Sequence, residues 1–188
     1  TKVVDSATRS SVPDLSQEEN AREWILSTPD DVFCNTRDKA VLSNVLNDYD
    51  QETQDFFRWQ VSYTPSELSA LIKSRIGIDF GDILSIDPVE RGASGRIIRL
   101  RIQGSKRSMT IGKELVIRKA FSTSHLYSSA FIVETERNTS GSITRFTLKG
   151  AGWGHGVGLC QIGAAVMSAK GYSYQEILSH YFPGTQLQ

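Results

Sequence analysis

The sequence predicts an α+β protein with a small antiparallel β-sheet or barrel-like core and short flanking helices. Short runs of alternating apolar and polar residues fill residues 83–149, and glycine-containing turns separate them. Segments with helix-capping residues and helical spacing of apolar residues lie on both sides of this stretch. The 188 residues are 39% hydrophobic and 22% charged, which is typical of a globular protein with an ordinary core.

The first part of the chain, residues 1–58, is acidic and only partly helical in its pattern. Ser16, followed three residues later by Glu19, predicts a capping box at the start of a short helix. A second helical pattern lies within residues 35–57, although Asn and Asp residues interrupt it. We expect this part to be a segment distinct from residues 59–188.

Residues 59–63 alternate as a β-strand does, and a well-marked helix follows. Thr64 as the N-cap, Pro65 in the first turn and Glu67 as the capping-box partner predict where this helix begins. Gly77 predicts where it ends, because glycine adopts the left-handed conformation that closes a helix.

The alternating region predicts short strands at residues 83–89, 96–103, 107–111, 130–136 and 142–148. In the second of these, alternation places Ile98 on the same face as Leu100 and Ile102. It places Ile97 on the opposite face, with the basic residues Arg99 and Arg101. A basic strand face is ordinarily a solvated surface, and a ligand-binding role is the alternative.

The C-terminal part of the chain predicts two helices. One is expected from Gln161 to Lys170, where Gly171 ends it. Ser173 and Glu176 form a second capping box, which predicts the start of the last helix.

The formal net charge of zero hides an asymmetry between the two halves. Residues 1–94 hold 9 basic and 17 acidic residues, a balance of −8, whereas residues 95–188 hold 12 basic and 4 acidic residues, a balance of +8. A surface for an anionic partner is therefore expected in the second half. A nucleic-acid partner is not expected, because aromatic residues do not interleave with the basic run. No membrane segment is expected, because no apolar run reaches the ~18 residues needed to span a bilayer.

Cys34 and Cys160 are too few for a disulfide scaffold or a structural zinc site. We expect two buried thiols, and a disulfide between them is the alternative. No metal-ligand spacing joins His155 to the other histidines or to Cys160, so no metal and no cofactor are expected.

Glycines occupy every second position from Gly150 to Gly158. They remove side chains from one face of an extended path, so a ligand or an aromatic ring can approach the backbone closely. The spacing fits neither the Walker phosphate loop nor the dinucleotide pattern. With these two patterns excluded, we expect a glycine-lined stretch of backbone that presents Trp153 and His155 and leads to Gln161. Tryptophan stacks on sugar faces, and His and Gln hydrogen-bond hydroxyl groups or a carboxylate.

Simpler interpretations stay open for the same residues. His155 either belongs to a site or only hydrogen-bonds the neighbouring backbone, and Trp153 is either exposed or part of the core. A nucleophilic pair of Cys160 and His155 is a weaker alternative.

The sequence resembles the SpoIID/LytB domain family, the family of stage II sporulation protein D. Residues 150–164 are similar to its glycine signature, and residues 171–185 are similar to its closing helix and Tyr/Pro-Gly end. Residues 91–96, Arg-Gly-Ala-Ser-Gly-Arg, resemble its RGxSGR turn. Arg118 and residues 126–131 resemble its arginine and its LxSxxF segment.

The resemblance implies an extracytoplasmic protein of the bacterial cell envelope that acts on peptidoglycan, in spore or cell-wall remodelling. Stage II sporulation protein D is a lytic transglycosylase that cuts glycan strands lacking stem peptides, and LytB-type members modify an N-acetylmuramoyl-L-alanine amidase. The transglycosylase reaction needs a carboxylic acid that protonates the glycosidic oxygen, and attack by the muramyl 6-hydroxyl then gives an anhydro sugar. Such strands carry lactyl carboxylates, which suit the basic half of the chain.

The family's catalytic glutamate lies in a Glu-Met-Pro context that is absent between Thr1 and Trp59. We therefore expect the chain to be the C-terminal part of such a domain, and a divergent non-catalytic member is the alternative. The catalytic residue stays unassigned, because Glu114 and Glu176 fit as turn and cap residues. Cys160 also departs from the family, in which serine is typical.

The resemblance and the residue chemistry together predict a substrate-binding site. His155, Gln161 and Arg118 are expected to line a groove, with Ser128 and Trp153 nearby. Peptidoglycan glycan strands are the expected ligand, and a cell-wall amidase is the second candidate partner.

Overall fold

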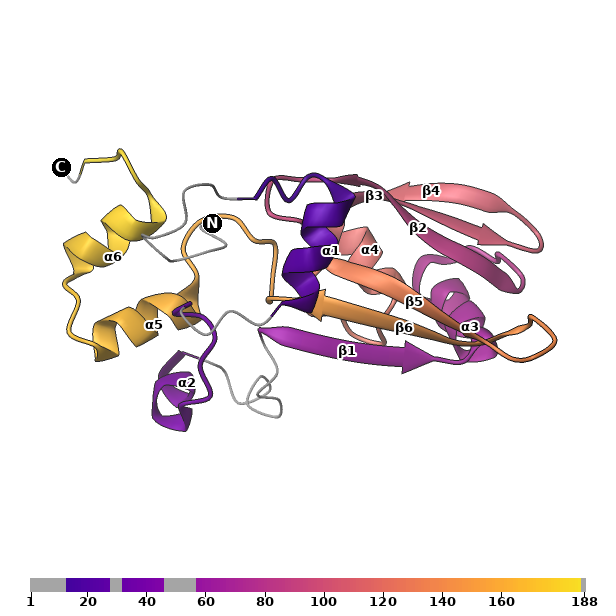
Figure 1. Ribbon diagram of the computed structural model, residues 1–188, viewed down its shortest axis with the longest axis horizontal. Helices are drawn as coiled ribbons and strands as arrows, with labels where there is room; N and C mark the ends of the chain where they lie inside the picture. Colours follow the sequence, from indigo (N-terminus) through magenta and orange to yellow (C-terminus); the bar gives the residue numbers. More distant parts are fainter. Residues whose placement is uncertain (1–12, 28–31, 46–56, 187–188) are drawn as a thin grey trace. The chain divides into compact units, whose positions relative to one another are not determined.

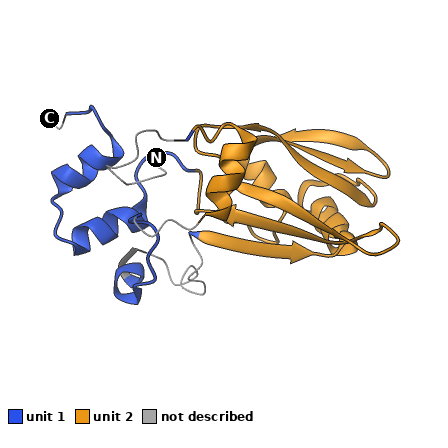
Figure 2. Ribbon diagram, viewed as in Figure 1, with its two compact units in different colours: residues 1–13, 28–57, 156–188 blue, residues 14–27, 58–155 orange. Residues whose placement is uncertain are grey.

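The computed structural model describes residues 13–27, 32–45 and 57–186, and the chain divides into two compact units. Unit 2 comprises residues 14–27 and 58–155, and unit 1 comprises residues 1–13, 28–57 and 156–188 (Figure 2). The chain therefore passes between the units four times. The division into residues 1–58 and 59–188 stays a prediction.

Unit 2 contains two antiparallel sheets of three strands each (Figure 1). The strand order of the first sheet is β1 (Arg58–Tyr63), β6 (Ile143–Ala151) and β5 (Phe131–Arg137). The order of the second is β2 (Ile83–Arg91), β3 (Ile97–Gly104) and β4 (Ser108–Gly112). The predicted α+β class is confirmed, and the strands form two separate sheets rather than a closed barrel.

Three described helices belong to unit 2: α1 (Glu18–Leu26), α3 (Pro65–Ile76) and α4 (Glu114–Ala120). Unit 1 contains α2 (Lys39–Val45), α5 (Gln161–Ala169) and α6 (Tyr174–Tyr181). Within residues 13–27, 32–45 and 57–186, no helix has the length and apolar character needed to cross a membrane.

One apolar cluster joins both sheets of unit 2 to α3 and α4. Phe121, Phe131 and Phe146 are among its largest fully buried side chains. The rings of Phe121 and Phe131 meet edge-on, with centroids 5.8 Å apart. Because full burial of one such side chain contributes about 1.5–3 kcal/mol, this cluster is the main source of stability in the unit.

A buried segment, residues 128–130, connects the two sheets. The N–H of Ile97, at the start of β3, donates to the carbonyl of Ser129 at 2.9 Å. The N–H of Ala151, at the end of β6, donates to the carbonyl of Ala130 at 2.9 Å. The segment therefore lies between a strand of one sheet and the end of a strand of the other.

Helices α3 and α6 begin with the predicted capping boxes. The carboxylate of Glu67 accepts from the N–H of Thr64 at 2.8 Å, and that of Glu176 accepts from the N–H of Ser173 at 2.7 Å. These backbone hydrogen bonds, with those from the cap hydroxyls, hold the pKa of both glutamates below the usual value. Gly77, at a φ of +73°, ends α3 as expected.

Helix α1 does not begin with the predicted capping box. Its N-cap is Gln17, which makes no side-chain cap hydrogen bond. Ser16 turns to Asp14 instead, and its N–H and hydroxyl donate to the Asp14 carboxylate at 3.0 and 2.7 Å. The prediction of a Ser16–Glu19 box was wrong because a carboxylate two residues upstream competes for the same serine.

Arg91 holds α1 against the sheets of unit 2. Its Nε and Nη2 donate to the two carboxylate oxygens of Glu18 at 2.6 and 2.8 Å. Its Nη1 donates to the carbonyl of Gly95, and its Nη2 also donates to that of Phe131, both at 2.8 Å. The Arg91 side chain is 1% exposed, so one buried guanidinium joins α1, the turn after β2, and β5.

Strand β3 departs from the predicted alternation. Ile97 is fully buried and Ile98 is exposed, so the prediction that Ile97 faces outward was wrong. The register explains the difference, because Glu90 pairs with Arg99 whereas Arg91 pairs with Ile97. Ile98 therefore lies at a bulge, where one extra residue shifts the phase of the side chains.

Helix α4 was not expected from the sequence. It follows Lys113, whose φ of +69° is the one positive value among the described non-glycine residues. A non-glycine residue in such a region costs about 1–3 kcal/mol. The Lys113 N–H donates to the carbonyl of Ile98 at 3.2 Å, and its own carbonyl accepts from Val116 and Ile117, so neighbouring backbone holds the strained residue in place.

Replacing Lys113 by glycine is expected to raise the free energy of unfolding by about 1 kcal/mol, because glycine adopts this φ without a Cβ clash. Urea unfolding of the purified protein measures the change. Lys119→Gly, in the last turn of α4, is the matched control and is expected to lose about 1 kcal/mol. A Lys113→Gly protein less stable than the wild type would contradict the strain at this position.

Unit 1 is organised around α5, which packs against α2 and α6. The ring of Phe33 meets the rings of Tyr172 and His180 edge-on, each with centroids 5.6 Å apart. Cys160 is the N-cap of α5, and its Sγ accepts from the N–H of Gly163 at 3.4 Å. Cys160 therefore caps α5 at a position where serine is a preferred residue in helices generally.

Candidate functional site

The glycine-rich segment contains two kinds of glycine. Gly150 lies in β6, where a Cβ would stand 2.1 Å from Cζ2 of Trp59, so close packing excludes a side chain. The glycines that follow have φ values from +69° to +80°, a region that residues with side chains rarely adopt. These are Gly152, Gly154, Gly156 and Gly158. The alternation therefore reflects one close contact and a series of backbone turns, and the path beyond Ala151 is not a strand.

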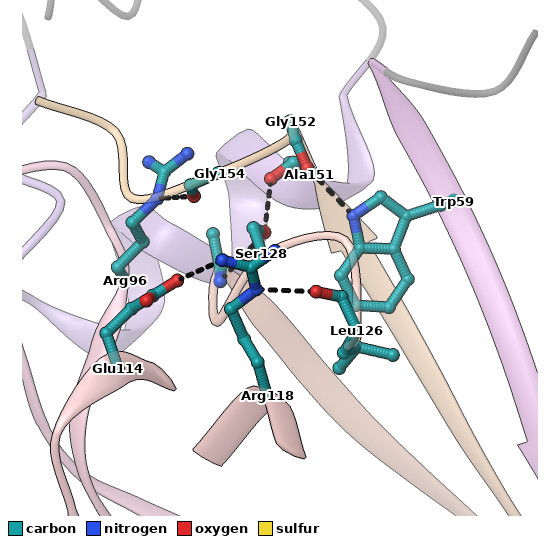
Figure 3. Close-up of polar contacts among 10 residues, drawn as sticks. Trp59, Arg96, Glu114, Arg118, Leu126, Ser128, Ala151, Gly152 and Gly154 are labelled. Carbon is teal, nitrogen blue, oxygen red and sulfur yellow. Dashed lines mark hydrogen bonds and ion pairs between the residues drawn. The ribbon is translucent and has the colours of Figure 1, made fainter. Parts of the chain in front are cut away.

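Side chains from three other parts of unit 2 hold carbonyl groups of residues 151–154, which we call the clamped segment (Figure 3). The hydrogen bonds are Ser128 Oγ to Ala151 O at 2.8 Å, Trp59 Nε1 to Gly152 O at 3.1 Å, and Arg96 Nε to Gly154 O at 2.8 Å. The N–H of Gly154 also donates to the carbonyl of Tyr127 at 2.8 Å. Backbone bonds and side-chain donors therefore fix the segment from both sides.

The clamped segment displays an aromatic ring at the surface. Trp153 is 37% exposed, and its ring meets that of Tyr127 edge-on, with centroids 5.2 Å apart. Tyr127 in turn lies 5.6 Å from the ring of Trp59 in the core. The interpretation of Trp153 as a core residue is therefore wrong. His155, the next residue after the segment, is also exposed.

Arg118 and Ser128 support the backbone around this segment. The Arg118 side chain is 13% exposed, and its Nε donates to the carbonyl of Leu126 at 2.6 Å. Its Nη1 lies 3.4 Å from a carboxylate oxygen of Glu114 (Figure 3). Ser128 has no exposed surface, and its hydroxyl also accepts from the N–H of Ala130 at 3.1 Å.

The five predicted site residues do not all lie in one unit. Gln161 is the first residue of α5, is exposed, and belongs to unit 1. The other four belong to unit 2, where the hydrogen bonds above link Ser128 and the backbone next to Trp153. The participation of Gln161 in a shared site stays a prediction.

Sequence reasoning missed Trp59, Arg96 and Tyr127. Each supports the clamped segment through a carbonyl group or a ring, and no sequence spacing reveals such a contact. A signal was available for Arg96 in the RGxSGR-like turn. Another was available for Trp59, because a buried indole N–H needs an acceptor.

Basic side chains on the outer faces of the sheets are paired across strands. Arg99 lies 3.8 Å from Glu90 on β2, and Nε of Arg101 donates to the hydroxyl of Ser108 on β4 at 3.3 Å. In the other sheet, the ammonium of Lys149 lies 2.8 Å from a carboxylate oxygen of Glu134. Such pairs favour the interpretation of a solvated face over that of an anion-binding face. Among the residues with a described placement, no group of three or more His, Cys, Asp or Glu residues is suited to hold a metal ion.

The fold and the site together define a class of α+β protein in which a clamped, glycine-rich segment at the end of a central strand displays exposed Trp and His side chains. Residues 1–158 match the family described as a domain of unknown function, DUF8618. The chain belongs to this family.

A local match links the chain to a named bacterial protein. This chain is 42% identical over 55 residues to a protein of Bacillus subtilis (strain 168) named amidase enhancer. The match covers 29% of this chain and 7% of the length of that relative. It supports the resemblance to the SpoIID/LytB family, whereas the placement of this chain in the C-terminal part of such a domain stays a prediction.

Proposed function

We propose that this chain acts on peptidoglycan in the bacterial cell envelope, outside the cytoplasm, and binds glycan strands that lack stem peptides. The observation that carries the proposal is the supported display of Trp153, beside the exposed His155, by the clamped segment. A ring already fixed in place loses little conformational freedom on binding, and its face suits the apolar face of a sugar. The local match to the amidase enhancer supports a cell-wall role.

In this proposal the predicted residues divide into direct contacts and supports. Trp153 stacks on a sugar ring, and His155 hydrogen-bonds a hydroxyl group or the lactyl carboxylate of muramic acid. Gln161, at the start of α5, is the third proposed contact. Arg118 and Ser128 act through the backbone that they hold.

We further propose that strand cleavage follows the lytic transglycosylase route, in spore or cell-wall remodelling. A carboxylic acid protonates the glycosidic oxygen as the bond from that oxygen to the anomeric carbon breaks. The resulting carboxylate accepts the proton of the muramyl 6-hydroxyl, whose oxygen bonds to the anomeric carbon, so a 1,6-anhydro sugar forms and the other sugar leaves with a free hydroxyl. Glu114 pairs with Arg118, so we assign it to supporting that side chain. The acid would then be a glutamate in another part of a larger domain, of which this chain is the C-terminal part.

The second candidate function is the modification of an N-acetylmuramoyl-L-alanine amidase, and the name of the local relative favours it. Adding the purified chain to such an amidase acting on cell walls tests this candidate. A change in cleavage rate, with a chain that does not bind glycan strands by itself, would favour amidase modification over strand binding.

Replacing Trp153 by alanine is expected to weaken binding of purified stem-free glycan strands about tenfold, because the stacking ring is lost. Co-sedimentation or calorimetry with strands of defined length measures the affinity. Tyr174→Ala, which removes an exposed aromatic ring from α6, is the matched control and is expected to bind like the wild type. Affinity within twofold of the wild type for both Trp153→Ala and His155→Ala would contradict the assigned site.

A further inference from the structure

We infer that Arg96 is a positioning residue, which sets the orientation of Trp153 and His155 by holding the carbonyl of Gly154. The inference rests on the proposed function for the identity of the ligand, and on the structure for the role of Arg96. No contact between Arg96 and a glycan is required.

The bond from Arg96 reaches the peptide that lies between the two displayed side chains. Its Nε donates to the carbonyl of Gly154 at 2.8 Å, and the donor belongs to a residue 58 positions earlier in the chain. The donor is charged, and a charge-assisted hydrogen bond is about twice as strong as a neutral one. The carbonyl of Arg96 itself accepts from the N–H of Gly92 at 2.9 Å, so the arginine projects from a closed turn.

The side of Gly154 that a Cβ would occupy is open, and two hydrogen bonds hold its peptide groups. A Cβ at Gly154 would meet nothing within 4 Å, and its φ is +78°. Its N–H bonds to Tyr127 and its carbonyl bonds to Arg96. Ala151, in contrast, is fully buried at the end of β6. Loss of the Arg96 side chain would therefore release the peptide after Gly154 while the strand end stays fixed.

The guanidinium group also lies along the backbone of the segment. A Cβ at Gly152 would stand 3.5 Å from Nη2 of Arg96. One side chain therefore borders both glycines that flank Trp153. Figure 3 shows Arg96 reaching the segment from the side of the chain opposite Trp59.

Hydrogen exchange at Gly154 tests the inference without any ligand. In Arg96→Ala, the amide of Gly154 is expected to exchange at least about tenfold faster than in the wild type, because its bond to Tyr127 opens more often. Exchange in β1 and β5 is expected to stay within twofold. Arg99→Ala is the matched control, since it removes an exposed arginine of β3 that is not part of the clamp.

Chemical rescue separates the shape of the guanidinium from its charge. Millimolar ethylguanidinium is expected to restore slow exchange at Gly154 in Arg96→Ala, and ethylammonium at the same concentration is not. Binding of stem-free strands is expected to fall about tenfold in Arg96→Ala and to recover with ethylguanidinium. Neither change is expected in Arg99→Ala.

Unchanged exchange at Gly154 in Arg96→Ala would overturn the inference. If strand binding also weakened while exchange stayed unchanged, Arg96 would be a direct ligand contact instead. A wild-type protein that fails to bind strands would overturn the proposed function alone. The exchange measurement still decides the role of Arg96 in that case.

Discussion

Gly150→Ala is expected to lower the free energy of unfolding by about 3 kcal/mol, at the upper end of the range for overpacked cores. The new Cβ would stand 2.1 Å from the Trp59 ring, a distance that requires the ring or the strand to move. The Trp59 ring is buried, and the rings of Tyr127 and Phe131 lie beside it at centroid distances of 5.6 and 6.3 Å, so a shift of the ring disturbs its neighbours. Any shift also lengthens the bond from Trp59 Nε1 to Gly152.

Gly112→Ala and Gly154→Ala are the comparison variants for Gly150→Ala. At Gly112, in β4, a Cβ would meet one atom at an ordinary 3.7 Å, so Gly112→Ala is expected to change stability by less than about 0.5 kcal/mol. Gly154→Ala has open space but a positive φ, and its expected cost is about 1–2 kcal/mol. Urea unfolding measures the loss of stability in the three variants, which is expected to increase from Gly112→Ala to Gly154→Ala to Gly150→Ala. An equal cost at Gly150 and Gly112 would show that the Trp59 contact does not limit the packing.

Glu18→Gln is expected to destabilise the protein by about 2–3 kcal/mol, because it leaves the buried charge of Arg91 without its carboxylate. Loss of one partner from a fully buried pair costs about 3–5 kcal/mol. The expected value is lower here because the Glu18 side chain is 46% exposed, so water replaces part of the lost interaction. The carbonyls of Gly95 and Phe131 also continue to accept from Arg91.

Glu90→Gln is the matched control for this pair. Glu90 and Arg99 are about half exposed and 3.8 Å apart, so the variant is expected to lose less than about 0.5 kcal/mol. Thermal or urea unfolding at two salt concentrations measures both variants, and only the Arg91 pair is expected to resist salt. Equal losses in the two variants would show that burial of Arg91 adds nothing to its pairing with Glu18.

The capping boxes of α3 and α6 were predicted correctly. The start of α3 is fixed by residues 64–67 and the start of α6 by residues 173–176, and each box closes within its own turn. Where two local signals compete, as Asp14 and Glu19 do for Ser16, the sequence does not show which one prevails. Helix α4 escaped prediction because it has only 7 residues and follows a strained lysine rather than a capping residue.

Long-range features could not be predicted in the same way. Alternation in residues 59–63 indicated a strand, but not that its partner is β6. The phase error at Ile97 arose from a bulge, which depends on the pairing of β2 with β3. The sequence singled out the glycines, Trp153 and His155, and the structure shows both side chains exposed, whereas their roles in a site stay predictions. Their supports at Trp59 and Arg96 were not identified from the sequence, because a bond to a backbone carbonyl leaves no mark on the accepting residue.

The two arginines of the RGxSGR-like turn have separate structural tasks. Arg91 binds α1 and β5, and Arg96 binds the clamped segment. The turn between them therefore links the position of α1 to the position of the clamped segment that carries Trp153. The resemblance identified this turn, and the structure supplies the physical reason for both of its charged residues.

The separation of these contacts along the chain sets the order in which they can form during synthesis. Glu18 leaves the ribosome 73 positions before Arg91, and Trp59 leaves 93 positions before Gly152. The centre strand, β6, is the last strand of its sheet to be made, so β1 and β5 lack their shared partner until then. The clamped segment directly follows this strand. The sheet is therefore completed only after β6 has been synthesised, and the surface that carries Trp153 forms at the same stage.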